Sequence, residues 1–345
     1  MALPIKPPLE PMLAKLEKEI PRGDGWRYEP KWDGFRAIVY RDGGEVLLGS
    51  RGQKEMQRYF PELLNALAAA LPDKVVVDGE IVLAWDGVLD FEVLQQRIHP
   101  AESRVNRLAK ETPASFVAFD LLAEGAKDLR TRPLEERWER LCSMLKPRST
   151  AATMKAILAP KTTVVLTPQT GDPDEAARWF EELEGSGLDG VIAKRDDLRY
   201  QPGKRAMVKV KHARTIDCVV GGYRIHKSGE GVGSLLLGLY DDTGALHQVG
   251  AAGAFSAKAR LEMLDILKPL EGGAGFPGGD LLGGPNRWNQ REKDWIPLKP
   301  KLVCEVAYDH FQGGRRFRHL AQFQRWRKDR KPKDCTFDQI APGRG

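Results

Sequence analysis

The chain has 345 residues, of which 41% are hydrophobic and 30% charged, a composition typical of a globular protein of about two domains. No apolar run approaches the roughly 20 residues that a membrane-spanning helix needs, and the N-terminus lacks an apolar core of signal-peptide length. We therefore expect an untargeted, cytoplasmic protein. Residues 1–211 contain 33 basic and 33 acidic side chains, and residues 212–345 contain 21 and 15, so the net charge of +6 lies in the second part. This division favours a polyanionic partner such as nucleic acid.

The cysteines and histidines exclude several kinds of site. The four cysteines lie far apart, without C-x-x-C spacing, which predicts buried free thiols rather than a zinc site or a disulfide framework: Cys142, Cys218, Cys304 and Cys335. The six histidines are scattered and form no H-E-x-x-H motif. Metalloprotease and hydrolase chemistry is therefore not expected.

Short apolar runs alternate with helical stretches through residues 1–211. Residues 36–40 and 45–48 flank a D-G-G sequence, which predicts a tight β-hairpin. Residues 74–84 and 115–122 are rich in β-branched or aromatic side chains and predict buried strands. Helices are expected where a proline suits the first helical position and after an aspartate: Pro61–Leu71, Pro133–Leu145, and a stretch from Asp172 to Gly185. These elements predict an α+β domain of antiparallel sheets flanked by helices.

A new series of short strands with Gly-rich turns begins near residues 209–217, where we place a domain boundary after residue 211. A single helix is expected over Ser256–Lys268, with Ser256 as its cap. A small β-barrel with one helix is typical of the oligonucleotide-binding (OB) fold, which we expect over residues 212–345. Residues 271–286 contain seven glycines and predict a mobile loop.

The motif that points most directly to chemistry is K-W-D-G-F-R, from Lys31 to Arg36. Taken alone, it also fits a surface strand that ends in a solvated lysine and a D-G turn. Further motifs follow in order: S-R-G (50–52), V-D-G-E (77–80), F-D (119–120), D-G-V-I-A-K (189–194), M-V-K-V-K (207–211) and R-H-L-A-Q-F-Q-R-W-R-K-D-R (318–330). The last of them, taken alone, also fits a solvated basic helix or tail that binds polyanions.

Together these motifs resemble those of the covalent nucleotidyltransferases, which are ATP-dependent DNA ligases, RNA ligases and mRNA capping enzymes. The resemblance extends from Glu29 to Arg330, and the compact size and the sequence L-D-G-V-I-A-K-R are similar to small bacterial ATP-dependent DNA ligases of the mycobacterial C type. It implies an adenylation (nucleotidyltransferase) domain over residues 1–211 followed by the OB-fold domain. It also implies sealing of 3′-OH/5′-phosphate nicks in duplex DNA, in DNA repair, through a lysyl-AMP intermediate. The implied cofactors are ATP and Mg²⁺ or Mn²⁺. The implied partners are nicked duplex DNA and unidentified repair proteins, bound by a monomer.

The resemblance also implies roles for single residues. Lys31 would be the nucleophile that attacks the α-phosphorus of ATP, and it must do so as a neutral amine. Cations nearby, including Lys209, Lys211 and the metal ion, are expected to lower its pKa. Lys209 and Lys211 would touch the α-phosphate, and Asp189 would hold the divalent cation together with Glu80.

The remaining implied roles concern the nucleotide and the nick. Glu29 would read the adenine edge and Phe119 would stack on the ring. Arg36 and Glu80 would hold the ribose and the adjacent phosphate. Arg51 would bind the 5′-phosphate of the nick. In the last motif, two arginines would orient the β- and γ-phosphates and an aspartate would fix those arginines or the metal: Arg325, Arg327 and Asp329.

Two positions depart from the pattern of the family. Asp189 stands where many members have glutamate, and Arg330 stands where lysine is usual. The sequence leaves two rival functions open. One is an RNA ligase or a GTP-dependent capping enzyme, and the other is a non-catalytic nucleic-acid-binding protein.

Overall fold

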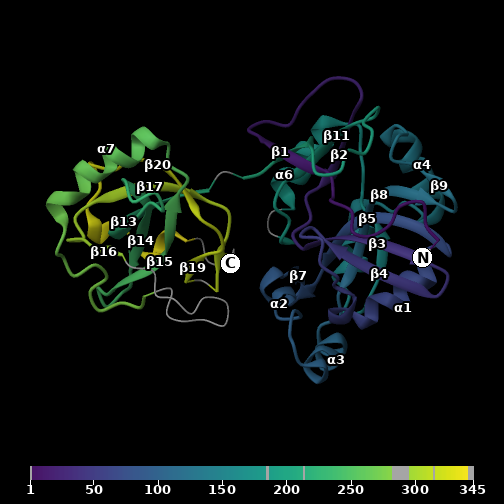
Figure 1. Ribbon diagram of the computed structural model, residues 1–345, viewed down its shortest axis with the longest axis horizontal. Coiled ribbons are helices and arrows are strands. Elements are labelled where there is room, and N and C mark those ends of the chain that lie inside the picture. The colour runs from purple at the N-terminus through teal and green to yellow at the C-terminus, as the bar shows by residue number, and fades with distance from the viewer. Residues whose placement is uncertain (1, 184–185, 213, 282–294, 314, 341–345) are drawn as a thin grey trace. The chain divides into compact units, whose positions relative to one another are not determined.

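We describe a computed structural model of the protein, covering residues 2–183, 186–212, 214–281, 295–313 and 315–340. The chain forms two compact units, Met1–Lys211 and His212–Gly345, and we treat each by itself. Figure 1 shows a mixed α+β first unit and a second unit built largely of strands. Within the described ranges, every helix is too short or too polar to span a lipid bilayer.

The larger sheet of the first unit carries the predicted hairpin and both predicted buried strands. Its strand order is β10-β8-β5-β3-β4, with the short β9 added beside β8. The strands are β3 (Phe35–Asp42), β4 (Glu45–Ser50), β5 (Lys74–Val82), β8 (Ser115–Glu124), β9 (Lys127–Asp128) and β10 (Val164–Leu166). A separate hairpin, β6 (Ala84–Trp85) and β7 (Val88–Leu89), follows β5. Neighbours in the larger sheet are antiparallel except β8 and β10, which run parallel.

Helices cover one face of this sheet. Side chains alternate along β3, so that Ala37 and Val39 pack in the core beneath the helices, while Ile38 and Tyr40 point to the other face. The helices of the first unit are α1 (Pro61–Ala70), α2 (Phe91–Gln95), α3 (Glu102–Glu111), α4 (Leu134–Met144), α5 (Thr150–Ile157) and α6 (Pro173–Glu182), with a 3₁₀ turn at Gln57–Tyr59. Pro133 is the cap of α4 rather than its first residue. The expected helix after Asp172 is α6, and Gly185 lies outside the described residues.

A second, four-stranded sheet completes the first unit, in the order β1-β12-β11-β2. Its strands are β1 (Leu13–Glu17), β2 (Trp26–Pro30), β11 (Val191–Arg195) and β12 (Arg205–Val210), with β1 and β12 parallel. A small core joins the two sheets, because Met207 of β12 packs in one cluster with Ile38 and Tyr40 of β3. Two of the predicted motifs lie on β11 and β12, and a third begins directly after β2, so the sheet brings distant parts of the sequence together.

The second unit is a closed β-barrel. Its strands pair in the closed order β13-β14-β15-β20-β17 and back to β13. The short strand β16 also pairs with β13 but is not part of this closed ring. The strands are β13 (Arg214–Ile225), β14 (Val232–Tyr240), β15 (Leu246–Gly253), β16 (Ile296–Pro297), β17 (Val303–Tyr308) and β20 (Ala321–Trp326), beside the hairpin β18 (Phe311–Gln312) and β19 (Arg316–Phe317). Five strands closed in this way, with one helix between the third and fourth, make the OB-type barrel expected from the sequence.

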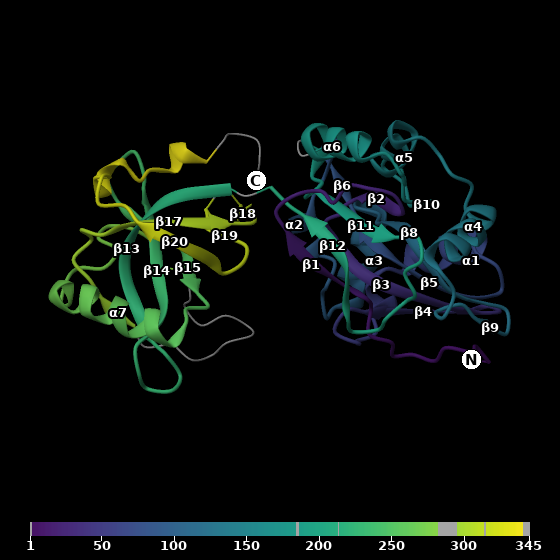
Figure 2. The same cartoon turned by 90° about the horizontal axis from the view of Figure 1, so that it is seen from above.

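The helix α7 (Ala257–Leu267) packs on this barrel (Figure 2), and Met263 and Leu267 enter the barrel core. The Ser256 side chain caps it by accepting a hydrogen bond from the backbone N–H of Ala259 at 3.2 Å. Short 3₁₀ turns follow α7 and close the chain: Lys268–Leu270, Pro332–Asp334 and Phe337–Gln339.

The Gly-rich segment is better defined than its composition predicts. Phe276 is 5% exposed and belongs to the barrel core, and residue 271 pairs with Leu298. The prediction of a mobile loop is therefore wrong for residues 271–281, because one aromatic side chain fixes the segment to the core. Residues 282–286 lie outside the described part of the chain.

Candidate active site

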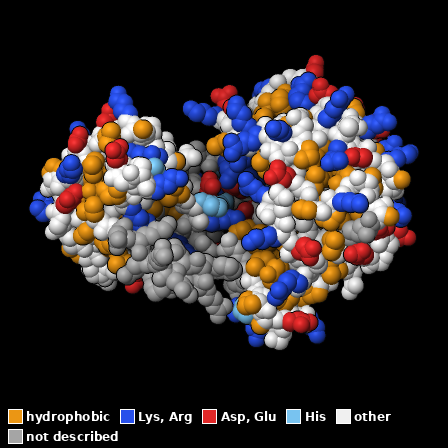
Figure 3. Space-filling view, viewed as in Figure 1, with side chains coloured by type: hydrophobic (Ala, Val, Ile, Leu, Met, Phe, Trp, Pro, Cys, Tyr) orange, Lys and Arg blue, Asp and Glu red, His pale blue; other side chains and the backbone are white. Residues whose placement is uncertain are grey.

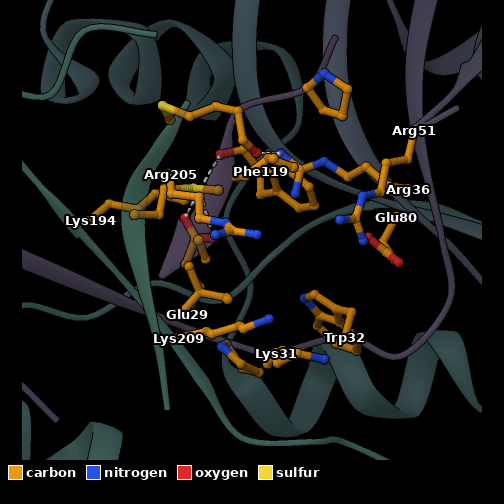
Figure 4. A pocket seen from close by; sticks show the side chains of 17 residues that line it. Glu29, Lys31, Trp32, Arg36, Arg51, Glu80, Phe119, Lys194, Arg205 and Lys209 are labelled. Carbon is orange, nitrogen blue, oxygen red and sulfur yellow. Dashed lines mark hydrogen bonds and ion pairs between the residues drawn. The ribbon is translucent and has the colours of Figure 1, made fainter. Parts of the chain in front are cut away.

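A pocket lies where the two sheets of the first unit meet, and most of the predicted site residues line it. Figure 4 shows Lys31 and Lys209 at one end of this pocket, Phe119 at the other, and Glu29 between them on the Lys194 side. Seven predicted residues are among its lining: Glu29, Lys31, Arg36, Arg51, Glu80, Phe119 and Lys209. Six of the sequence motifs thus converge on one cavity, since Ile192 and Lys194 of the D-G-V-I-A-K motif also line it.

Lys31 lies in an ion-pair cluster with the motif of residues 189–194. Its Nζ is 2.9 Å from Oδ2 of Asp189, and Nζ of Lys211 is 2.7 Å from the same oxygen. The Asp189 side chain is 7% exposed, and the two lysine side chains are 17% and 16% exposed. One nearly buried carboxylate therefore holds two ammonium groups, from the residues that directly follow β2 and β12.

The backbone holds this cluster in register. Lys31 N–H donates to the carbonyl of Gly190 at 2.8 Å, and Asp189 N–H donates to the carbonyl of Lys31 at 3.1 Å. Gly190 has φ +126°, and a Cβ there would stand 2.0 Å from the carbonyl oxygen of Val210. Gly34 is equally constrained, since a Cβ would stand 2.0 Å from the carbonyl oxygen of Ile81. Close backbone approach thus requires the glycine of each D-G pair, Gly34 and Gly190.

The pKa of Lys31 shifts in the opposite direction from the one that the sequence predicts. Burial alone lowers the pKa of Lys31, but the carboxylates of Asp189, Asp33 and Glu80 outweigh it, so the pKa lies above its ordinary value. The prediction that Lys209 and Lys211 lower the pKa of Lys31 is therefore wrong for the protein by itself. The reason is that Asp189 interposes a negative charge between the lysine ammonium groups.

Glu29 is held by residues that the sequence analysis did not assign. Its Oε1 accepts from Lys194 Nζ at 2.9 Å and from Gln169 Nε2 at 3.0 Å, and its Oε2 lies 2.8 Å from Lys194 Nζ. Burial raises the pKa of Glu29 in spite of the Lys194 ammonium. Lys194 ends the D-G-V-I-A-K motif, and membership of that motif was the signal available in the sequence.

Phe119 lies against two cations. The Arg36 guanidinium carbon is 4.2 Å from the ring centroid, and Lys194 Nζ is 4.8 Å from it. Arg36 in turn makes a bidentate ion pair with Asp78, with Nε to Oδ1 at 2.6 Å and Nη2 to Oδ2 at 2.7 Å. The aromatic ring and the guanidinium are therefore preorganised together on the pocket wall.

Trp32 and Arg205 also line the pocket and were not predicted as site residues. The Trp32 indole N–H donates to Thr167 Oγ1 at 2.9 Å, which fixes the side chain next to Lys31. Arg51 follows β4 and is exposed at the pocket. Figure 3 shows basic and acidic side chains interspersed over the visible face of the first unit, in keeping with its balanced charge.

Glu80 makes the site sensitive to pH. Burial raises its pKa to about 7, although the charges of Arg36 and Lys31 oppose the change. An unfolded glutamate releases its proton near pH 4.3, so folding takes up a proton between about pH 4.5 and 7, and the ionised carboxyl destabilises the fold above that window. We expect Glu80→Gln to raise the melting temperature by several degrees at pH 8 and to leave it unchanged near pH 4. Calorimetry at both pH values tests this, with the exposed Glu139→Gln as control. An equal gain at both pH values would refute it.

The last motif forms its own ion-pair cluster in the second unit. Arg327 Nη1 lies 3.0 Å from both carboxylate oxygens of Asp217, and its Nη2 lies 2.7 Å from Oδ2 of Asp329. Arg330 Nε is 3.0 Å from Asp217 Oδ2. Arg325, on β20, lies 2.6 Å from Glu305. Asp329 thus holds an arginine, one of its two predicted alternatives, and Asp217 is a partner that the sequence analysis missed.

Comparisons with protein families and with single proteins both identify DNA ligases as relatives of this chain. Residues 11–211 match the ATP dependent DNA ligase domain, and residues 228–330 match the ATP dependent DNA ligase C terminal region. The chain is 51% identical to DNA ligase C1 of Mycolicibacterium smegmatis and 50% identical to DNA ligase C of Mycobacterium tuberculosis, each over 99% of this chain and 96% of the relative.

A solved structure of a Lig E DNA ligase is similar in fold, with a TM-score of 0.55 at 18% identity, over 92% of this chain and 99% of that one. The motifs, the pocket that they line, the OB-type barrel and the full-length relatives lead to the same assignment. The chain belongs to the ATP-dependent DNA ligases.

Proposed function

We propose that this DNA ligase seals 3′-OH/5′-phosphate nicks in duplex DNA through a covalent AMP on Lys31. The observation that carries this proposal is the place of Lys31. It lies in a pocket lined by six motifs, 2.9 Å from Asp189 and across from Phe119. Because the attacking species must be a neutral amine, ATP binding has to replace the ion pair with Asp189 before the amine attacks.

Three transfers make up the reaction. The Lys31 amine attacks the α-phosphorus of ATP and pyrophosphate leaves. The 5′-phosphate oxygen of the nick then attacks the lysyl-AMP phosphorus and frees the lysine. The 3′-OH finally attacks the adenylated 5′-phosphate and AMP leaves. Phosphoryl transfer depends on positioning and on neutralising charge, which suits a pocket that mixes ammonium, guanidinium and carboxylate groups.

The nucleotide would lie along the pocket. Glu29 would accept from the adenine amino group, since its carboxylate is already oriented by Lys194 and Gln169. Phe119 would stack on the ring. Arg36 and Glu80 would contact the ribose and the adjacent phosphate, with the α-phosphate held at the other end of the pocket by two lysines, Lys209 and Lys211.

A divalent cation, Mg²⁺ or Mn²⁺, would be held largely by the substrate. Within the described residues, no group of three or more His, Cys, Asp or Glu side chains could hold a metal ion by itself. Mg²⁺ commonly binds through one or two carboxylates together with substrate phosphates and water, which fits a site that offers Asp189 and Glu80. When bound, the cation would neutralise charge on the triphosphate.

The C-terminal motif would serve the first step, with Arg325 and Arg327 orienting the β- and γ-phosphates and Asp329 fixing Arg327. We place the adenylation domain at residues 1–211 and the OB-fold domain at residues 212–345, with residues 209–217 as the hinge between reaction steps. Of these, residue 213 lies outside the described part of the chain. We also propose that the enzyme acts as a cytoplasmic monomer in DNA repair.

Arg51 would bind the 5′-phosphate of the nick, so its loss should affect one step only. We expect Arg51→Ala to form lysyl-AMP at the wild-type rate and to transfer AMP to nicked DNA about a hundredfold more slowly. Single-turnover transfer from the purified, adenylated enzyme measures the second step directly. Exposed Lys54→Ala, three residues away, is the control. Slowing of both steps to the same extent would count against this role.

The proposed function is tested by supplying labelled ATP or GTP and then nicked DNA or nicked RNA. We expect label on the protein from ATP and sealing of nicked DNA. Labelling by GTP alone would indicate a capping-type enzyme, and sealing of RNA alone an RNA ligase. DNA binding without any labelling of the wild-type protein would indicate a non-catalytic binding protein.

A further inference from the structure

Behind the pocket wall, four residues form a closed ring of hydrogen bonds that none of the motif roles uses. Tyr200 Oη donates to Asp78 Oδ2 at 2.6 Å and accepts from the backbone N–H of Met12 at 3.0 Å. Asp78 binds Arg36 through both carboxylate oxygens. Arg36 Nη2 closes the ring by donating to the carbonyl of Met12 at 3.5 Å.

Three residues of the ring are buried, and two of its four residues line the pocket. Tyr200 is 4% exposed, Asp78 is 0% exposed and Met12 is 1% exposed. Arg36 and Met12 themselves line the pocket, Met12 within the segment Pro11–Ala14 that forms part of its wall. Figure 4 shows Arg36 next to Phe119 and Glu80. The Tyr200 hydroxyl therefore connects a guanidinium in the pocket to the backbone of its wall.

The chemistry of the ring explains why a hydroxyl is needed at Tyr200. The Asp78 carboxylate faces Arg36 with one edge, and Tyr200 supplies a further donor to Oδ2. The same hydroxyl satisfies a buried backbone N–H, which is costly to leave unpaired. Only a group that both donates and accepts can fill this position, and a phenol is such a group.

We propose that Tyr200 is a positioning residue for ATP, which sets the Arg36 guanidinium through Asp78 and the pocket wall through Met12. This inference rests on the proposed function, in which Arg36 and Phe119 contact the nucleotide. Tyr200 itself touches no substrate. It acts on binding because it fixes two sides of the pocket at the spacing the nucleotide needs.

A matched control exists in the same core cluster. Tyr40 is 0% exposed, and its hydroxyl accepts from the backbone N–H of Leu9 at 3.0 Å, as Tyr200 does from Met12. Both phenols thus fix the N-terminal segment, but of the two, Tyr200 is the one with a hydrogen bond to Asp78. Tyr40→Phe and Tyr200→Phe each remove one oxygen and one backbone hydrogen bond.

The experiment measures lysyl-AMP formation from labelled ATP over a range of ATP concentrations in the full-length protein. We expect Tyr200→Phe to raise KM for ATP about fivefold or more, with kcat within about twofold of wild type. Tyr40→Phe should leave KM within about twofold, although its melting temperature falls because it too loses a backbone hydrogen bond. Unchanged KM in Tyr200→Phe, or an equal rise in Tyr40→Phe, would overturn the inference.

A double-mutant cycle gives a second readout that a purely structural role would not move. Asp78→Asn should itself raise KM for ATP, and Tyr200→Phe should add little on that background, because Tyr200 sets the Arg36 guanidinium through Asp78. If the increase in KM of the double variant equals the product of the two single increases, Tyr200 does not act through Asp78 and the inference fails. The proposed function fails separately, through absence of labelling in the wild-type protein.

Discussion

Lys31→Ala is expected to abolish transfer of AMP from ATP to the protein, with a loss of at least about a thousandfold, because it removes the amine that forms the covalent bond. Sealing of a nick that already carries AMP on its 5′-phosphate should persist, since that step uses the 3′-OH as nucleophile. The two results together would place Lys31 in the covalent step. Labelled ATP and a chemically adenylated nick measure them in parallel.

We expect Lys31→Ala to leave the fold of the first unit intact. Asp189 keeps its ion pair with Lys211 at 2.7 Å when Lys31 is removed, so no buried carboxylate is left without a cation. Lys155→Ala, at an exposed position on α5, is the control and should label as the wild type does. A covalent adduct in Lys31→Ala would show that another residue carries the AMP.

The second large effect concerns stability. Arg137 of α4 is 0% exposed and makes a bidentate ion pair with Asp120 of the F-D motif, at 2.7 and 2.9 Å. It also donates to the carbonyls of Arg132 and Leu198. We expect Arg137→Ala to destabilise the first unit by about 3–5 kcal/mol, because it leaves the Asp120 charge buried without a partner. For a unit of this size, that corresponds to a fall of about 6–20 °C in melting temperature.

Another arginine on the same helix provides the comparison. Arg140 pairs with Glu124 at 3.0 Å, but its side chain is 36% exposed, so Arg140→Ala should cost no more than about 1 kcal/mol. Replacing both buried partners, as Asp120→Leu with Arg137→Met, should restore much of the loss because no buried charge remains. Calorimetry on the three variants measures these differences. Similar losses for Arg137→Ala and Arg140→Ala would contradict the argument from burial.

Local sequence patterns predicted the elements that begin with a clear turn or proline signal and missed short helices that lack one. The hairpin of β3 and β4 was predicted because D-G-G favours a tight turn, and α1 because Pro61 suits the first helical position. The helices α2, α3 and α5 were not predicted. Of these, α2 has five residues and α5 has eight, which is too short for a clear periodic signal. Phe276 shows the opposite case, in which seven glycines concealed a core residue.

The balance of charge predicted the right class of partner but not the arrangement of the charges. The last motif, with its excess of basic residues, is a set of ion pairs in which Arg327 and Arg330 share Asp217. Asp217 lies 110 positions from Arg327 along the chain, so only strand pairing in the barrel joins them.

The sequence by itself determined the family and the order of the motifs, and it predicted the nucleophile, because covalent nucleotidyl transfer needs particular side chains and glycines at fixed places. The tertiary structure decided which of these side chains meet and what their charges do. Glu29 is paired with Lys194, 165 positions away, and Tyr200 with Asp78, 122 positions away. The raised pKa of Lys31 was likewise beyond the sequence. A pKa depends on every charge within a few ångströms, and folding, rather than spacing along the chain, set Asp189 between the two lysines.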